Sequence, residues 1–129
     1  MSVRQNRAGF TLIELLIVVV IIGILAMIAI PSFKSTKGKT YAATLRTDLR
    51  NLATAEEAYF YERGTYGANT ANLGFNGSAG VTITLNEATL SGWSATATHP
   101  LSDPLVCAVF YGSAAPVAPA TQEGKIVCQ

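Results

Sequence analysis

A single carboxylate stands in the most apolar stretch of the chain. Residues 10–30 include only two polar side chains, those of Thr11 and Glu14. As a helix this stretch would be about 31 Å long, close to the roughly 30 Å hydrocarbon core of a bilayer. An ionisable group in such a segment costs about 2.5–3.5 kcal/mol and usually has a partner. Since the stretch contains no cation, the partner of Glu14 must be created or supplied by another molecule.

Three interpretations of this segment compete. A secretory signal peptide would have a shorter apolar core followed by small residues at its cleavage site, but this run ends in Ile30 and Pro31. A plain membrane anchor would leave Glu14 unexplained. The third interpretation starts from residues 7–15, RAGFTLIEL. This motif resembles the class III signal peptide of type IV prepilins and pseudopilins.

The resemblance implies how the missing cation arises. In this family a membrane peptidase cuts after the glycine and methylates the new N-terminal residue. That places cleavage between Gly9 and Phe10 and makes Phe10 an N-methylphenylalanine. Cleavage would expose an ammonium, charged at neutral pH, one helical turn from Glu14. A pair within one subunit is one option, but the resemblance implies that Glu14 meets the Phe10 ammonium of a neighbouring subunit during filament assembly.

Two residues are expected to weaken the N-terminal helix. Pro31 lacks an N–H group and clashes with the preceding turn, and it matches the helix-breaking proline of the family. Gly23 is the second weak point, because glycine disfavours a helix interior. A basic cluster follows the proline and consists of Lys34, Lys37 and Lys39. We expect its side chains either to be solvated or to contact lipid headgroups or filament carboxylates.

Apolar residues continue at helical spacing beyond the proline. They form a stripe of Tyr41, Leu45, Leu49, Leu52 and Tyr59. The charged residues are expected mostly off this stripe: Lys37, Arg46, Asp48, Arg50, Glu56, Glu57 and Glu62. With Gly64 as a stop signal, the pattern predicts one long helix over residues 10–63. The run Tyr59-Phe60-Tyr61 is expected to pack against a sheet rather than to form an electron path.

The remaining residues predict a small antiparallel sheet, so the expected fold class is α+β. Strand-like runs cover residues 81–85, 93–98, 105–111 and a short 125–128. Alternation places Leu105, Cys107, Val109 and Tyr111 on one face. The loop over residues 64–80 should be packed by Tyr66, Leu73 and Phe75. Within it, Asn76-Gly77-Ser78 is expected to form a turn, and the same three residues are also a formal glycosylation sequon. The Ala- and Pro-rich residues 112–124 are expected to be irregular.

The chain has two cysteines, Cys107 and Cys128. Outside the cytoplasm the pair should oxidise and close the loop between them. Free thiols and a metal pair are the alternatives, but two sulfurs and a distant His99 make a poor zinc site. A bridge here is similar to the disulfide-bounded C-terminal region of type IV pilins.

Several function classes are disfavoured. The formal net charge of +1 argues against a protein that binds nucleic acid by neutralising phosphates. No catalytic constellation is recognisable, so we expect no enzyme, no metal, no cofactor and no small-molecule substrate. The chain is instead expected to be the substrate of a prepilin peptidase and methyltransferase.

The resemblance implies the type IV pilin fold and the following organisation. Residues 1–9 are a leader that is removed, 10–31 a transmembrane and filament-core helix, 32–63 its amphipathic half, and 64–129 a globular head. The expected function is that of a structural subunit of an extracellular type IV pilus, for motility, adhesion or DNA uptake. The subunit is held in the inner membrane with its leader in the cytoplasm and its head outside. Its partners are lipid, the peptidase, the assembly platform and other copies of itself.

Two relatives of this function remain as alternatives, a minor pilin and a pseudopilin of a type II secretion system. Major pseudopilins commonly carry a calcium site in an acidic C-terminal loop. Here that region offers only Asp103 and Glu123, together with two cysteines, which favours a pilin.

Overall fold

The computed structural model describes Met1 and residues 8–129, with the side chains of residues 31–37 left outside the description. One helix is followed by strands and a short 3-10 helix. The elements are α1 (Leu12–Arg63), β1 (Thr82–Ala88), β2 (Gly92–Thr98), η1 (Pro100–Ser102), β3 (Val106–Gly112) and β4 (Val127–Cys128). The chain divides into two compact units, Met1–Thr36 and Lys37–Gln129, which are described separately below.

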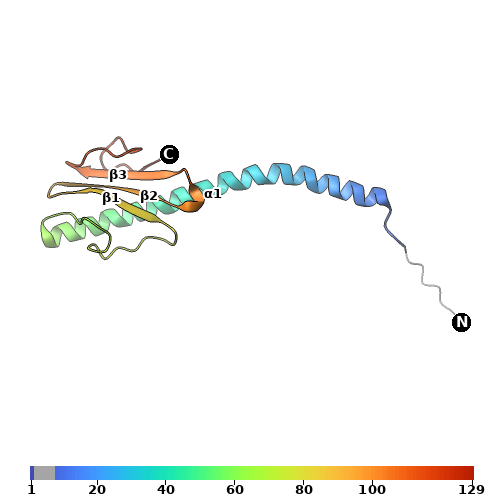
Figure 1. The fold of residues 1–129 in the computed structure, drawn as a ribbon, viewed down its shortest axis with the longest axis horizontal. Coiled ribbons are helices and arrows are strands. Elements are labelled where there is room, and N and C mark those ends of the chain that lie inside the picture. The colour runs from blue at the N-terminus through green and yellow to red at the C-terminus, as the bar shows by residue number, and fades with distance from the viewer. Residues whose placement is uncertain (2–7) are drawn as a thin grey trace. The chain divides into compact units, whose positions relative to one another are not determined.

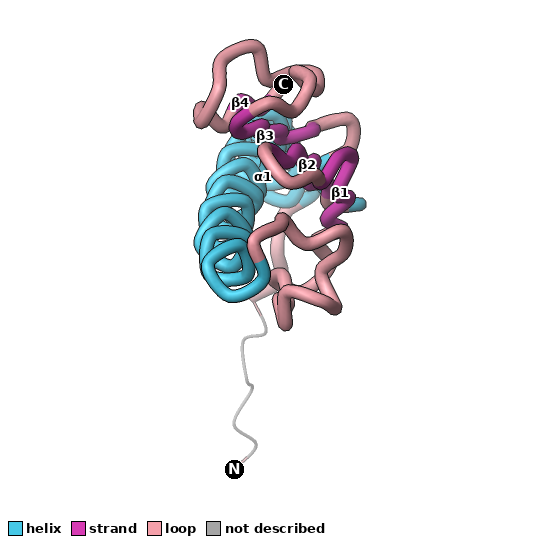
Figure 2. Tube along the Cα trace, turned by 90° about the vertical axis from the view of Figure 1, so that its left-hand side faces the viewer, coloured by secondary structure: helices cyan, strands magenta, loops and turns pink. Residues whose placement is uncertain are grey.

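The second unit, called the head here, is a helix packed on one sheet. The four strands are antiparallel and lie in the order β1-β2-β3-β4. Figure 1 shows β1, β2 and β3 side by side along the C-terminal part of α1, and Figure 2 shows the four strands in sequence across it. This confirms the predicted α+β fold with a long helix, three main strands and a short fourth.

The core of the head lies between α1 and the sheet. Leu45, Leu49 and Leu52 are fully buried, as the apolar stripe predicts. Their partners come from alternate positions of the two central strands: Trp93, Ala95 and Ala97 of β2, and Cys107 and Val109 of β3. Because side chains alternate across a strand, the other face of β3 carries a second set.

The second face of the sheet is covered by the Ala- and Pro-rich loop. Ala108 and Phe110 of β3 form a small buried cluster with Ala114 and Ala120. Residues 113–126 contain no helix or strand, so the loop is irregular as expected. It nevertheless contributes to burial, which the sequence interpretation did not include.

The first expected strand was predicted too short. β1 continues through Glu87 and Ala88 because a register shift between Leu85 and Glu87 breaks the alternation without ending the pairing with β2. The last strand is shorter than predicted, because Lys125 N–H donates to the Gln122 carbonyl in a turn.

Two expectations about side chains of α1 were wrong. Asp48 and Glu56 were expected off the buried stripe, but they are 4% and 0% exposed. Glu56 follows Leu52 by four residues and therefore lies on the same helical face. The aromatic run does not pack as a unit either: Phe60 stacks on Tyr66 with ring centroids 4.7 Å apart, whereas Tyr61 is 92% exposed.

Candidate assembly site

The expected cleavage bond lies just before α1. Residues 8–11 are non-helical, and Gly9 and Phe10 are exposed. A Cβ atom placed on Gly9 would meet no atom within 4 Å. Among the described residues, packing therefore imposes no requirement for glycine at this position. A requirement for glycine stays a prediction about the peptidase that would bind this segment.

Glu14 closes the N-terminus of α1 through a reciprocal pair of hydrogen bonds. The Thr11 backbone N–H donates to Glu14 Oε2 at 2.8 Å, and the Glu14 backbone N–H donates to Thr11 Oγ1 at 3.3 Å. This is a capping box, in which each side chain satisfies a backbone donor that the helix leaves unpaired. The Thr-x-x-Glu spacing at residues 11–14 is the sequence signal for a capping box, and it was not among the expectations above.

The capping box places the Glu14 carboxylate beside the residue that cleavage would make the new terminus. Glu14 accepts from the N–H of Thr11, and Thr11 is bonded directly to Phe10. A carboxylate at a helix N-terminus is also favoured by the positive end of the helix dipole. In the uncleaved chain the carboxylate therefore has neutral donors. Cleavage would add a charged donor, the new ammonium group of Phe10.

The segment that follows is a helix with its apolar side chains uncovered. Residues Leu12–Ile30 have a mean hydropathy of 3.2, and none of this span is buried within the chain. By length and composition it can cross a membrane. A helix that is apolar on every face is stable only when lipid or another protein covers it. This unit therefore requires a partner outside its own chain.

The expected weak points of the helix are only partly described. α1 is assigned as continuous through Gly23 and Pro31. Gly23 has open space where a Cβ would be. The side chains of Pro31, Lys34 and Lys37 lie outside the described set, and Lys39 is exposed. A kink at Gly23 and Pro31 remains a prediction.

Two buried carboxylates of α1 fasten the loop that follows the helix. Asp48 accepts from the Ser78 backbone N–H at 2.8 Å and from Ser78 Oγ at 2.9 Å. Glu56 Oε2 accepts from the Gly67 backbone N–H at 2.7 Å. The first contact uses Ser78, the last residue of the predicted Asn76-Gly77-Ser78 turn, but the turn itself runs from Ser78 to Val81, where the Val81 N–H donates to the Ser78 carbonyl at 3.0 Å. Neither contact was predicted from the sequence, because both carboxylates were expected off the apolar stripe.

The two carboxylate oxygens of Glu56 differ in their hydrogen bonding. In the described part of the chain its Oε1 atom is buried without a hydrogen-bond partner. Burial raises the pKa of Glu56, the Gly67 N–H opposes that shift, and the neighbouring Glu57 charge adds to it. This carboxyl group is therefore harder to ionise in the folded head than in the unfolded chain.

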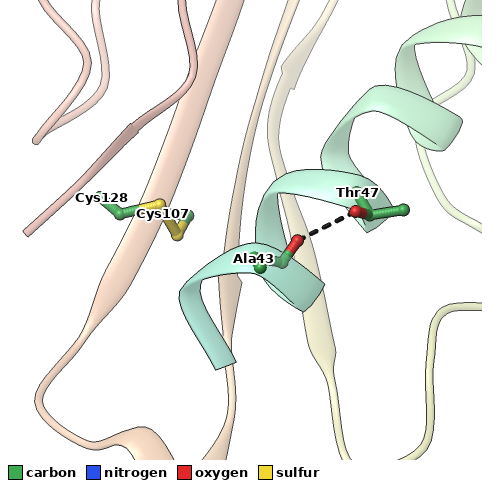
Figure 3. The surroundings of a disulfide bond; sticks show 4 residues. All are labelled: Ala43, Thr47, Cys107 and Cys128. Atoms are coloured by element: carbon green, nitrogen blue, oxygen red, sulfur yellow. Dashed lines mark hydrogen bonds between the residues drawn. A yellow bond between two sulfur atoms is a disulfide. The ribbon is translucent and has the colours of Figure 1, made fainter. Parts of the chain in front are cut away.

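The C-terminal strand is tied to β3 by a disulfide between Cys107 and Cys128. The same two residues are paired in the register of β3 and β4. Figure 3 shows the bridge near the turn of α1 that contains Ala43 and Thr47, where Thr47 Oγ1 donates to the Ala43 carbonyl at 2.9 Å. Within the part of the chain that the structure describes, no three His, Cys, Asp or Glu residues are placed to bind a metal ion.

His99, the third residue considered for metal binding, has a local role. Its ring stacks on Tyr41 with centroids 4.4 Å apart, and Nδ1 accepts from the Leu101 backbone N–H at 3.1 Å. It therefore caps η1 and is half-buried. Among the residues that the structure describes, no hydrogen bonds join His99 to an acid and a nucleophile.

Comparisons with known proteins agree with these features. A family model described as the prokaryotic N-terminal methylation motif matches residues 4–30. The type IV major pilin protein PilA of Myxococcus xanthus is 46% identical over 71 residues, which cover 55% of this chain and 32% of that protein. The type II secretion system core protein G of Pseudomonas aeruginosa is 33% identical over 70 residues, 54% of this chain and 49% of that protein. The chain thus spans about a third of the first relative's length and about half of the second's.

A third relative matches over more of both chains. The type IV wide pilus major component PilA4 of Thermus thermophilus is 32% identical over 99 residues. The match covers 74% of this chain and 76% of that protein. An alignment of 99 residues is longer than the helix, so the likeness extends into the head.

Proposed function

The chain belongs to the superfamily of type IV pilins and pseudopilins, and we propose that it is the structural subunit of an extracellular type IV pilus. One observation carries the proposal: a fully uncovered apolar helix with one carboxylate is joined to a head that has its own buried core. Such a chain is suited to bury its helix first in lipid and then among copies of itself. The similarity to a pilus component over three quarters of both chains supports a pilin over a pseudopilin.

Processing would prepare the subunit for assembly. A peptidase removes residues 1–9 after Gly9 and methylates Phe10, and the removed segment carries Arg4 and Arg7. The new ammonium at Phe10 is the cation that the apolar segment lacks. Before assembly the leader lies in the cytoplasm, residues 10–31 span the inner membrane, and the part of the head formed by residues 64–129 lies outside.

Glu14 would set the position of each incoming subunit. In the low-dielectric interior of a filament an unpaired carboxylate is costly, and pairing with the Phe10 ammonium of a neighbour removes much of that cost. Only one axial position brings the two groups together, so the pair would fix the register between subunits. The capping box keeps the carboxylate at the helix N-terminus until then.

A pair of variants separates this role from helix capping. Glu14→Ala removes both the carboxylate and the capping box, whereas Thr11→Ala removes the capping hydroxyl and keeps the carboxylate. We expect both variants to be cleaved at Gly9, but only Glu14→Ala to lose surface filaments. Immunoblots for the processed chain and electron microscopy of sheared filaments measure the two steps. Wild-type filaments in Glu14→Ala would exclude the assembly role, and equal loss in both variants would assign the effect to the cap.

A further inference from the structure

Three cations gather along one open groove of the head. The groove has a volume of about 510 Å³ and is lined by Arg46, Arg50, Tyr111, Gly124, Lys125 and Ile126. Arg46 and Arg50 are one helical turn apart on α1, and Lys125 lies just before β4. We call this surface the basic groove.

The basic groove has no carboxylate partner within the described part of the chain. Its three cations are exposed, and none makes an ion pair or hydrogen bond among the described residues. Most carboxylates of the head accept hydrogen bonds elsewhere: Asp48 from Ser78, Glu56 from Gly67, Glu57 from Tyr66, Glu87 from Ala115 and Glu123 from Gly112. Glu62 and Asp103 are exposed and have no such bond among the described residues.

Glu62 and the basic groove lie on different faces of the same rigid element. At about 100° and 1.5 Å per residue, Glu62 is roughly 120° around the helix from Arg50 and about 18 Å further along it. One copy therefore cannot bring the two together within itself. Complementary patches on different faces make a head-to-tail contact between copies, and such a contact repeats into an open filament unless the rotation closes a ring.

Glu62 is favoured over Asp103 as the group that enters the groove. It lies in the last turn of α1, whereas Asp103 lies in the loop after η1. The offset between Glu62 and the arginines is thus fixed by one helix. The preceding residue, Tyr61, is 92% exposed, and exposed tyrosine is typical of protein interfaces because its ring and hydroxyl both make contacts.

We propose that the basic groove binds Glu62 of a second copy and so aligns neighbouring heads in the filament. The inference rests on the proposed function and adds the contact between heads. The arginine fork matches a carboxylate in geometry and charge. A single exposed ion pair is weak. In the filament, however, every subunit would make this contact on both sides. A variant that placed like charges in the contact would therefore be repelled at every subunit.

A charge exchange tests the pairing. Arg50→Glu and Glu62→Arg each place like charges in the contact, and each should reduce sheared surface filaments by about tenfold or more. The double variant Arg50→Glu with Glu62→Arg restores opposite charges, so filaments should return to within about twofold of wild type.

The outcomes are distinguishable from those of the proposed function. Processing at Gly9 and the circular dichroism of each variant show that the chain is cleaved and folded. Wild-type filament yield in Arg50→Glu, or failure of the exchanged double variant to recover, would overturn the inference. Recovery of Arg50→Glu by Asp103→Lys instead would show that Asp103 is the partner. A wild-type chain absent from all filaments would instead refute the proposed function.

Discussion

The two halves of α1 are both helical but differ in where their apolar residues lie. In Leu12–Ile30 the apolar side chains surround the helix and all are exposed. Between Lys37 and Arg63 they form one stripe, and Leu45, Leu49 and Leu52 of that stripe are buried against the sheet. Both halves form a helix, so the difference lies in how the apolar residues are distributed around it. That distribution determines what covers the apolar side chains of each half. The second half is covered by its own chain, whereas the first must be covered by lipid or by other copies.

The largest expected difference between the halves is in solubility. A fragment of residues 37–129 contains the whole buried core and lacks the uncovered helix. We expect it to be a soluble, folded monomer, while the full chain requires detergent or lipid. Size-exclusion chromatography and circular dichroism measure both. An aggregated or unfolded fragment would show that the head depends on the apolar half.

A matched pair of leucine substitutions compares the halves within one chain. Leu49→Ala leaves a cavity in the core of the head and should lower its free energy of unfolding by about 2–5 kcal/mol. Leu16→Ala is in the exposed half, 57% exposed, and should leave the unfolding of the head unchanged. Denaturant titration of the full chain in detergent, followed by Trp93 fluorescence, makes the measurement. Equal effects would contradict the division into two units.

Loss of the disulfide should lower the unfolding free energy of the head by somewhat less than the largest core substitutions do. Cys107 and Cys128 are 21 residues apart, and closing a loop of that length restricts the unfolded chain by about 3 kcal/mol. Reduction of the fragment should therefore lower its unfolding free energy by about this amount. The double variant Cys107→Ala with Cys128→Ala should no longer respond to reductant. Two free thiols in the oxidised, denatured protein would disprove the bridge.

Glu56 should give the smallest effect, a dependence of stability on pH. Its pKa is raised in the folded head, so the folded state holds this proton more tightly than the unfolded state does. The stabilisation is fully present below the usual carboxyl pKa near 4.5 and is lost as the pH rises through the higher folded value.

Substitution isolates this contribution. Glu56→Gln cannot ionise, so its unfolding free energy should fall less than that of wild type between pH 4.5 and pH 7. Glu62→Gln removes an exposed carboxyl group and should retain the wild-type slope. Thermal unfolding of residues 37–129 across this pH range compares the three proteins. Identical slopes for wild type and Glu56→Gln would show that another group causes the dependence.

The sequence predicted the fold where one physical signal dominated. The apolar run and the leucines at helical spacing identified the two halves of α1. Strand-like runs identified β2 and β3, and alternation defined one face of β3. Prediction failed where a polar residue occupied a buried position. Glu56 continues the spacing of Leu45, Leu49 and Leu52, but a carboxylate in a stripe is recognisable only once its donor, the Gly67 N–H, is placed beside it.

The candidate site was predicted unevenly for a similar reason. Gly9, Phe10 and Glu14 were identified by their order along the chain, which needs no tertiary information. The basic groove was not, because Arg46 and Lys125 are far apart in sequence and meet only when β4 is tied to β3 beside the helix. The continuation of β1 past Leu85 was missed because a bulge breaks the alternation on which the prediction depended.

The proposed function depends on two steps, processing of this chain at Gly9 and polymerisation through its N-terminal helix. Both are measured together by mass spectrometry of the N-terminal peptide from sheared and imaged surface filaments. We expect the filaments to consist mainly of this chain, beginning at N-methyl-Phe10 and lacking residues 1–9. Filaments without this chain, with the protein confined to membranes, would contradict it and favour a pseudopilin.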